Sequence, residues 1–279
     1  MIDVSRPAIE PVPVPLDAPL RSALMSTGVQ TVEVAIEAAR AAAEVLLPRF
    51  GSERAIASKS TVTDLVSAAD IEAEQAIRSV LAVRVPGDSV VGEEGETTEG
   101  ASGRRWIVDP LDGTINFLYG IPAWCVSIAC EGEAGVVYDP VRDELFTAVA
   151  GAGAALNGEP LVAGGSAGPD ALGHALVATG FGYDAQRRAL QAAVVAQVLP
   201  QVRDIRRGGA AALDLAWCAA GRLDAYWERG VNEWDVAAGE MICAEAGRTV
   251  ARLEPSGELP WGTLASAPEI AGQLQALVI

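Results

Sequence analysis

Acidic residues accompany short apolar runs at three places in this chain of 279 residues. The run Val-Val-Gly-Glu-Glu-Gly at 90–95 ends in two adjacent carboxylates, and Trp-Ile-Val-Asp-Pro-Leu-Asp-Gly-Thr at 106–114 contains two further acids. Trp-Asp at 234–235 places another acid before an apolar, helix-like stretch. Carboxylate and carbonyl oxygens are the ligands that Mg²⁺ prefers, so these residues are candidates for metal-dependent chemistry.

The run 106–114 is the most informative of the three. Its apolar strand ends at Asp109, and Pro110 then forces a bend. Asp109, the carbonyl of Leu111 and Asp112 can therefore converge on one side of a tight turn as three oxygen ligands. A helical turn that begins at Asp112 or Gly113 would point free N–H groups at an anion, and a phosphate fits there. Taken alone, the motif is equally consistent with an Asx-turn that closes a hairpin.

The other two acidic sites have ordinary structural explanations when each is taken alone. Glu93 and Glu94 stand between glycines and fit a solvated loop. Asp235 fits the N-cap of a helix that continues through Ala246. Neither site by itself indicates a function.

Several common catalytic schemes lack their residues here. The single histidine, His174, lies in an apolar, strand-like run and is interpreted as structural. The single lysine, Lys59, stands in Ser-Lys-Ser without a glycine-rich phosphate loop. This removes most Ser-His-Asp, zincin and P-loop schemes, so catalysis must use carboxylates, hydroxyls and backbone groups.

Composition limits the partners and the compartment. A net charge of -17 repels a phosphate backbone, so we expect no direct nucleic-acid binding. The four cysteines have no CxxC spacing and fit buried, reduced thiols, and the chain starts without the pattern of a signal peptide. The uncharged stretch 113–130 is interrupted by polar and turn residues, so we expect a buried turn and strand there and no membrane span. We expect a cytoplasmic protein.

The elements that must position these residues can be read from periodicity. Helices are expected from Gln30 to Phe50 and from Asp70 to Arg84, because apolar residues recur there at helical spacing. Short apolar runs at 89–92, 106–109, 123–130, 135–138 and 144–150 predict one mixed or antiparallel sheet. After a small, polar stretch at 164–169, strand and helix signals alternate. We therefore expect a mixed α/β fold with a mobile Pro-rich arm at 1–29, an α+β subdomain at 30–165 and an α/β subdomain at 166–279.

The three acidic motifs, taken in this order, resemble those of the inositol monophosphatase family of metal-dependent phosphatases. The resemblance extends to Lys59 and to Thr-Asp-Leu-Val-Ser-Ala-Ala-Asp at 63–70, and downstream to Gly-Ala-Ala-Ala-Leu-Asp at 209–214 and Tyr-Trp-Glu-Arg-Gly at 226–230. It covers roughly residues 32–275. The family fold is a layered α-β-α-β-α sandwich, which agrees with the strand-rich middle and the alternating second half.

The resemblance implies a role for each matched residue. Glu93, Asp109 and the Leu111 carbonyl would hold one Mg²⁺, and Asp109, Asp112 and Asp235 a second. Glu93 would also reach a third, weaker metal, giving two or three per active site. Asp70 and Thr114, with Glu93, would orient the attacking water, and the N–H groups of Gly113 and Thr114 would bind the phosphate. Gly209, Ala210 and Glu228 would contact the rest of the substrate. Lys59, Asp64 and Glu94 would lie beside the metal ligands.

The implied reaction is the hydrolysis of a small phosphate monoester by in-line attack of water, without a covalent intermediate. Thr114 is a poor base, so it must pass its proton toward an ionised Asp70. Asp-Gly-Thr-Ile-Asn and Tyr-Trp-Glu favour the inositol phosphate branch, with myo-inositol and phosphate as products. The family also implies a homodimer and inhibition by lithium. Histidinol phosphate, fructose 1,6-bisphosphate and phosphoadenosine phosphate stay open as substrates, as does a non-catalytic regulatory binding protein.

Overall fold

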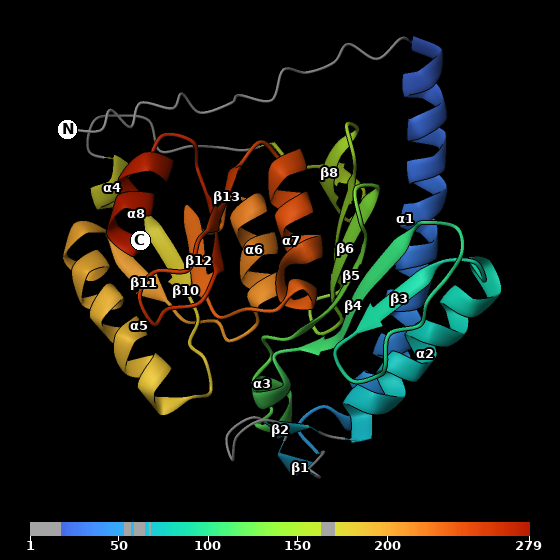
Figure 1. Ribbon diagram of the computed structural model, residues 1–279, viewed down its shortest axis with the longest axis horizontal. Helices are drawn as coiled ribbons and strands as arrows, with labels where there is room; N and C mark the ends of the chain where they lie inside the picture. Colours follow the sequence, from blue (N-terminus) through green and yellow to red (C-terminus); the bar gives the residue numbers. More distant parts are fainter. Residues whose placement is uncertain (1–17, 53–56, 59–64, 67, 163–170) are drawn as a thin grey trace.

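The computed structural model describes residues 18–52, 57–58, 65–66, 68–162 and 171–279. Five layers alternate helices and sheets across the molecule (Figure 1). In order they are helices α1 (Ala18–Leu46) and α2 (Ala68–Arg84), a seven-stranded sheet, helices α6 (Ala211–Ala219) and α7 (Glu233–Glu245), a five-stranded sheet, and helices α5 (Ala185–Val198) and α8 (Ala271–Val278). The predicted mixed α/β sandwich is confirmed.

The seven-stranded sheet follows chain order. Its strands are β3 (Ser89–Gly92), β4 (Arg105–Asp112), β5 (Cys125–Cys130), β6 (Ala134–Asp139), β7 (Glu144–Val149), β8 (Gly153–Leu156) and β9 (Glu159–Pro160). Only β3 and β4 are parallel, and every other neighbouring pair is antiparallel. The expectation of one mixed sheet from the middle of the chain is confirmed. The parallel pair brings the carboxyl ends of β3 and β4, and with them both acidic motifs, to the same edge.

The five-stranded sheet has a different order. Its strands are β10 (Leu176–Thr179), β11 (Asp204–Arg206), β12 (Ala225–Arg229), β13 (Thr249–Leu253) and β14 (Gly262–Ser266), arranged β11-β10-β12-β14-β13. Strand β10 runs parallel to both β11 and β12, whereas β14 is antiparallel to its neighbours. The β10–β11 connection contains α5, and the chain passes through α6 before it returns as β12 beside β10, so both parallel pairs have the helical crossover that parallel pairing requires.

The remaining elements are short. They are β1 (Ala57–Ser58) and β2 (Leu65–Val66), which pair with each other, α3 (Thr114–Leu118), α4 (Ala171–His174), and the 3₁₀ turns Leu47–Arg49 and Leu199–Gln201. The stretch 113–130 consists of α3, an exposed turn at 119–122 and the buried strand β5, so the expected strand is confirmed, whereas the turn is not buried. None of the described helices combines the length and apolar character needed to cross a bilayer.

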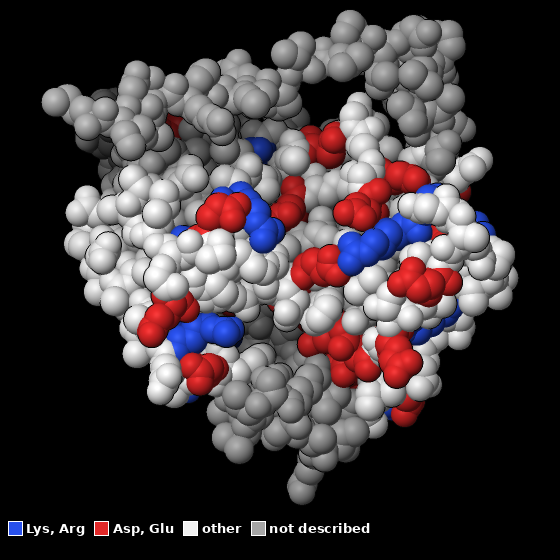
Figure 2. Space-filling view, in the orientation of Figure 1, with Lys and Arg blue, Asp and Glu red and all other residues white. Residues whose placement is uncertain are grey.

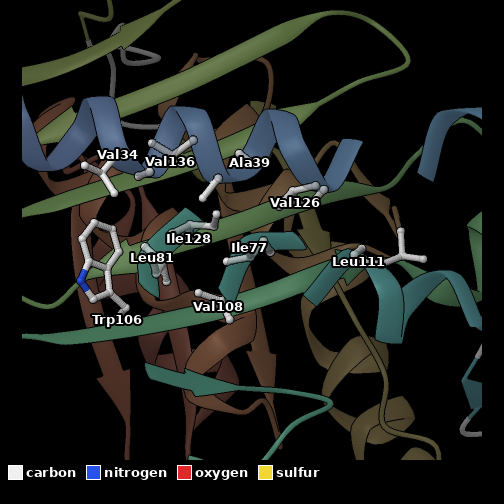
Figure 3. Packing of buried hydrophobic residues seen from close by; sticks show 14 of the residues in the cluster. Val34, Ala39, Ile77, Leu81, Trp106, Val108, Leu111, Val126, Ile128 and Val136 are labelled. Atoms are coloured by element: carbon white, nitrogen blue, oxygen red, sulfur yellow. The ribbon is translucent and has the colours of Figure 1, made fainter. Parts of the chain in front are cut away.

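Helix α1 packs on the seven-stranded sheet through a stripe of small residues. Ala35, Ala38, Ala39 and Ala42 are fully buried and recur at the i, i+3, i+4, i+7 spacing of one helix face. Figure 3 shows side chains of α1 and α2 meeting those of the sheet, with Val34, Ala39, Ile77 and Leu81 from the helices and Trp106, Val108, Val126, Ile128 and Val136 from the strands. This core holds α2 rigidly beside β4, next to the acidic edge.

Four further sequence expectations have different outcomes in the structure. The first helix begins at Ala18 rather than Gln30, since Pro19 is tolerated in a first turn and no proline follows until Pro48. His174 ends the short helix α4 and is exposed, so the prediction of a strand there is wrong. The four cysteines are free and buried, as expected. The expected boundary between residues 165 and 166 lies outside the described residues.

Candidate active site

A β-bulge brings the two acids of the central motif to one face of the sheet. Residues three apart in a regular strand would point to opposite faces. Here Asp109 pairs with Ser127 and Asp112 pairs with Cys125, so two residues of β4 oppose one of β5 between these pairs. Pro110 has no backbone N–H, so it leaves no donor without a partner where the bulge interrupts the hydrogen bonds between the strands. The bulge therefore restores the parity that puts both carboxylates on the same side.

Helix α3 begins directly after this bulge. Gly113 is its N-cap with φ of 94°, a left-handed conformation that favours glycine, and a β-carbon there would lie 2.9 Å from the Ala123 carbonyl oxygen. The Asn116 side chain donates to the carbonyl oxygens of Ala123, at 2.6 Å, and Gly208, at 2.9 Å. These bonds connect α3 to the loop before α6, so the turn at 112–114 is fixed from both sides.

The expected partnership of Thr114 and Asp70 is present. Thr114 Oγ1 lies 3.0 Å from Asp70 Oδ1, and both residues are buried. Thr114 Oγ1 also lies 3.1 Å from the Leu111 carbonyl oxygen. A hydroxyl has a single proton to donate. The Thr114 proton therefore has two alternative acceptors, a carboxylate on α2 and a carbonyl on β4.

Asp112 joins the first half of the chain to the second. Its Oδ1 accepts from Ala211 N at 3.1 Å and its Oδ2 from Ala212 N at 2.6 Å, which are the first amides of α6. These are amides that a helix cannot satisfy internally, and an anion is favoured next to them. Ala210, the N-cap of α6, is buried close behind Gly113 and does not line the cavity. Gly209 does line it.

Asp235 was expected to be the N-cap of α7, and this prediction is wrong. The N-cap is Asn232, and Asp235 is the third residue of the helix, where its Oδ2 accepts from Asn232 N at 2.6 Å. A carboxylate at this position satisfies the N-cap amide from inside the helix. The rest of the Asp235 carboxylate faces the cavity.

Glu228 enters the site from β12. Its Oε2 accepts from Tyr226 Oη at 2.7 Å. Its carboxylate also lies against Gly180, where an added β-carbon would be 1.7 Å from Oε2. Burial raises the pKa of Glu228, although the Tyr226 hydrogen bond and Arg207 act in the opposite direction.

These elements surround one cavity of about 420 Å³. Its walls are Glu93, Asp109, Leu111, Asp112, Gly113, Thr114, Phe181, Gly182, Tyr183, Asp184, Arg187, Arg207, Gly209, Ala211, Glu228, Gly230, Val231, Asn232, Trp234 and Asp235. Most of the expected site residues are thus brought together. Asp70 lies behind Thr114, Glu94 lies beside the cavity, and Lys59 and Asp64 lie outside the described residues.

The clustered carboxylates repel one another. Burial raises the pKa of Asp109 well above its ordinary value, and the charges of Glu93, Asp112 and Asp235 raise it further. Burial likewise raises the pKa of Asp112 to about 7, against the two α6 hydrogen bonds. This is the electrostatic situation that a bound cation would relieve.

The donor set fits a hard cation such as Mg²⁺. Every side chain in the cluster offers oxygen, the Leu111 carbonyl is another oxygen, and none of these groups is a soft ligand. Among the residues that the structure describes, no three acidic, histidine or cysteine side chains are already grouped closely enough to hold a metal ion. The chemistry of the donors, rather than a preformed cage, supports the fit.

Some residues of the site were not found from the sequence. Glu74 is buried beneath the Glu93 loop, and its position four residues after Asp70 in the expected helix was the available signal. Arg187 and Arg207 line the cavity, and the charge of Arg207 acts to lower the pKa of Glu228 and of Asp214. They bring positive charge to a site otherwise dominated by acids. On the face shown in Figure 2, acidic and basic side chains are interspersed.

Known proteins and solved structures that resemble this chain come from one family. The profile of the inositol monophosphatase family matches residues 29–278. Inositol-1-monophosphatase SuhB of Mycobacterium tuberculosis is 45% identical over 235 residues, which cover 80% of this chain and 80% of that protein. The Nus factor SuhB of Pseudomonas aeruginosa is 42% identical over 238 residues, or 81% of this chain and 87% of that protein. The crystal structure of the extragenic suppressor protein SuhB from Bartonella henselae superposes with a TM-score of 0.80 at 36% identity, covering 89% of this chain and 98% of that chain.

Proposed function

Because this chain belongs to the inositol monophosphatase family, we propose that it is a Mg²⁺-dependent phosphatase of small phosphate monoesters, with inositol 1-phosphate as its substrate. Family membership supports phosphatase chemistry on this scaffold. The observation that carries the finer proposal is the convergence of Glu93, Asp109, Asp112 and Asp235 on one cavity with Thr114 at its wall.

The oxygen ligands would be shared between two metal positions. Glu93, Asp109 and the Leu111 carbonyl would hold one Mg²⁺, and Asp109, Asp112 and Asp235 would hold the second. Glu93 would also reach a third, weaker position. When bound, Mg²⁺ supplies the positive charge that stabilises the phosphate oxygens and the departing alkoxide.

Thr114 and Asp70 would handle the proton. Thr114 Oγ1 accepts a proton from the attacking water while its own proton moves to Asp70 Oδ1, 3.0 Å away. If the Leu111 carbonyl oxygen binds a metal ion, it is a weaker hydrogen-bond acceptor for Thr114. Asp70 is then the better acceptor of the Thr114 proton. Glu93 would orient the same water from the opposite motif.

The rest of the cavity would bind the substrate. The N–H groups of Gly113 and Thr114 would hold the phosphate, and Glu228, fixed by Tyr226, would accept from a hydroxyl of the polyol. Gly209 leaves room at the wall between them. Arg207, which also lines the cavity, would add positive charge near the phosphate.

The test is release of phosphate from inositol 1-phosphate, histidinol phosphate, fructose 1,6-bisphosphate and phosphoadenosine phosphate, each with and without Mg²⁺. Asp70→Asn is the sharpest control, because it removes the proton acceptor without touching a proposed ligand. Mg²⁺-dependent release from inositol 1-phosphate that this variant abolishes would support the proposal. Release confined to another ester would move the substrate, and no release from any ester by folded protein would contradict the enzymatic proposal.

A regulatory binding role is the second candidate. It is supported by the 42% identity to a protein named Nus factor SuhB. A homodimer is part of either proposal, and sedimentation of the purified chain measures it. Asp70 is fully buried, so Asp70→Asn should abolish phosphate release and leave the molecular surface, and with it a regulatory contact, intact.

A further inference from the structure

Glu74 lies on α2 and faces the loop that carries Glu93. Its side chain is only 3% exposed. Both of its carboxylate oxygens accept from that loop, Oε2 from Glu94 N at 2.7 Å and Oε1 from Gly95 N at 2.9 Å. These amides belong to the two residues directly after Glu93. Glu74 therefore fixes the backbone at the point where the proposed ligand leaves β3.

Arg78 completes this arrangement from the next turn of α2. Its Nε donates to Glu74 Oε1 at 2.7 Å, and its Nη1 donates to Thr98 Oγ1 at 3.1 Å. Thr98 in turn exchanges two backbone hydrogen bonds of 2.9 Å with Val90 of β3. Hydrogen bonds that involve an ionised group are shorter and stronger than neutral ones. Both limbs of the Glu93 loop are thus held to the same helix.

Two glycines make this close approach possible. A β-carbon at Gly92 would lie 2.4 Å from Glu74 Oε1, and one at Gly95 would lie 2.6 Å from the same oxygen. Neither glycine has a positive φ, so a strained backbone does not explain the choice of glycine. The space that a side chain would occupy is filled by the Glu74 carboxylate.

The same face of α2 carries Asp70. Residues four apart on a helix are neighbours on its surface, so Asp70 and Glu74 point in the same direction. Asp70 accepts from Thr114 at the start of α3, whereas Glu74 accepts from the loop after Glu93. One helix, packed rigidly into the core, thereby bonds to both motifs that would orient the attacking water.

We propose that Glu74 is a positioning residue for Glu93. The Glu74 carboxylate holds the loop that carries Glu93 against α2, at a fixed distance from Thr114. The inference rests on the proposed function, in which Glu93 is a metal ligand. Loss of the Glu74 carboxylate leaves the amides of Glu94 and Gly95 without their acceptor, and the Glu93 carboxylate then no longer stays where the ligands converge.

The test is Glu74→Gln with Glu72→Gln as its matched control. Glutamine has one acceptor oxygen and cannot accept from both loop amides and Arg78. Glu72 lies on the same helix but pairs with Arg49 at the surface. In Glu74→Gln we expect the Mg²⁺ concentration for half-maximal activity, and the Kd for Mn²⁺ measured by water proton relaxation, to rise about 10- to 100-fold, with substrate KM at saturating Mg²⁺ within about twofold. Glu72→Gln should match the wild type.

Gly95→Ala gives an independent test that keeps the carboxylate. Its methyl group would displace the loop from Glu74 and should reproduce the loss of metal affinity. Because both changes break one contact, the double variant should lose no more than either single variant. Hydrogen exchange of the loop amides at 93–95 should be faster in both single variants than in Glu72→Gln.

The outcomes separate this inference from the proposed function. If the wild type is active and both Glu74→Gln and Gly95→Ala bind Mn²⁺ as Glu72→Gln does, the positioning role is wrong and the function stands. If the wild type neither releases phosphate nor binds Mn²⁺, the proposed function is wrong. Hydrogen exchange of the amides at 93–95 then tests whether Glu74 still holds the loop. Unchanged exchange in both variants would then overturn the inference.

Discussion

Raising the pH of the metal-free protein from about 5 to about 8 should destabilise it, because the active-site carboxylates are buried beside one another. Burial raises the pKa of Asp112 from 3.8 to about 7. Between these values the folded chain keeps a proton that the unfolded chain has released. The stability from this group is therefore fully present below pH 3.8 and is lost as the pH rises through about 7.

The magnitude follows from the width of this interval. Each pKa unit corresponds to about 1.4 kcal/mol, and roughly two units lie between pH 5 and the folded pKa, which gives about 3 kcal/mol. For a chain of this size that is a fall in Tm of roughly 6–12 °C. Asp109 and Asp235 contribute in the same direction, because burial and neighbouring carboxylates raise both pKa values.

Thermal unfolding in EDTA at a series of pH values measures this slope. Asp112→Asn removes one titrating group, so its Tm should fall less steeply with pH even though the variant is less stable overall. Mg²⁺ should raise Tm more at the high end of the range, where the carboxylates are ionised. A wild-type Tm that stays constant or rises between pH 5 and 8, or an equal slope in Asp112→Asn, would refute the reasoning.

Three further predictions concern single side chains. Asp70→Asn should lower kcat by about 10²–10⁴-fold while Mn²⁺ binding by water proton relaxation stays unchanged, and retained turnover would contradict the proton path. Tyr226→Phe removes the hydrogen bond that fixes Glu228, so steady-state kinetics should show kcat/KM for inositol 1-phosphate about 10-fold lower with an unchanged Mg²⁺ requirement. Trp124→Ala empties a fully buried site packed edge-on against Phe117, with ring centroids 5.1 Å apart, and should cost about 3–5 kcal/mol in urea unfolding. A loss below about 1 kcal/mol would show that the site collapses around the cavity.

The acidic motifs and the strands that carry them could be predicted from the sequence. Strand β3 has the expected bounds, Ser89–Gly92, because its apolar run is short and is bounded by turn residues. A helical turn was expected to begin at Asp112 or Gly113, and α3 begins one residue later, at Thr114, with Gly113 as its N-cap. Local pattern, together with the family resemblance, therefore located the acidic residues of the cavity, but not the loop at 181–184 or the two arginines, Arg187 and Arg207, that also line it.

Local pattern was less reliable at helix ends. Asp235 and Asn232 are both good N-cap residues, and only the observed hydrogen bond places Asp235 at the third position of α7. The start of α1 at Ala18 rather than Gln30 has the same origin, because a proline is compatible both with an arm and with a first helical turn.

What the sequence by itself determined about this protein is which residue types occur, in which order, and on which short elements. The tertiary structure decided which of them meet. Asp109 and Asp112 share a face only because β5 pairs with β4 around a bulge. Asp112 accepts hydrogen bonds from amides of α6 that are about a hundred residues away along the chain. The physical reason is that strand parity, register and the burial of a carboxylate such as Glu74 depend on neighbours distant in the chain, which periodicity does not encode.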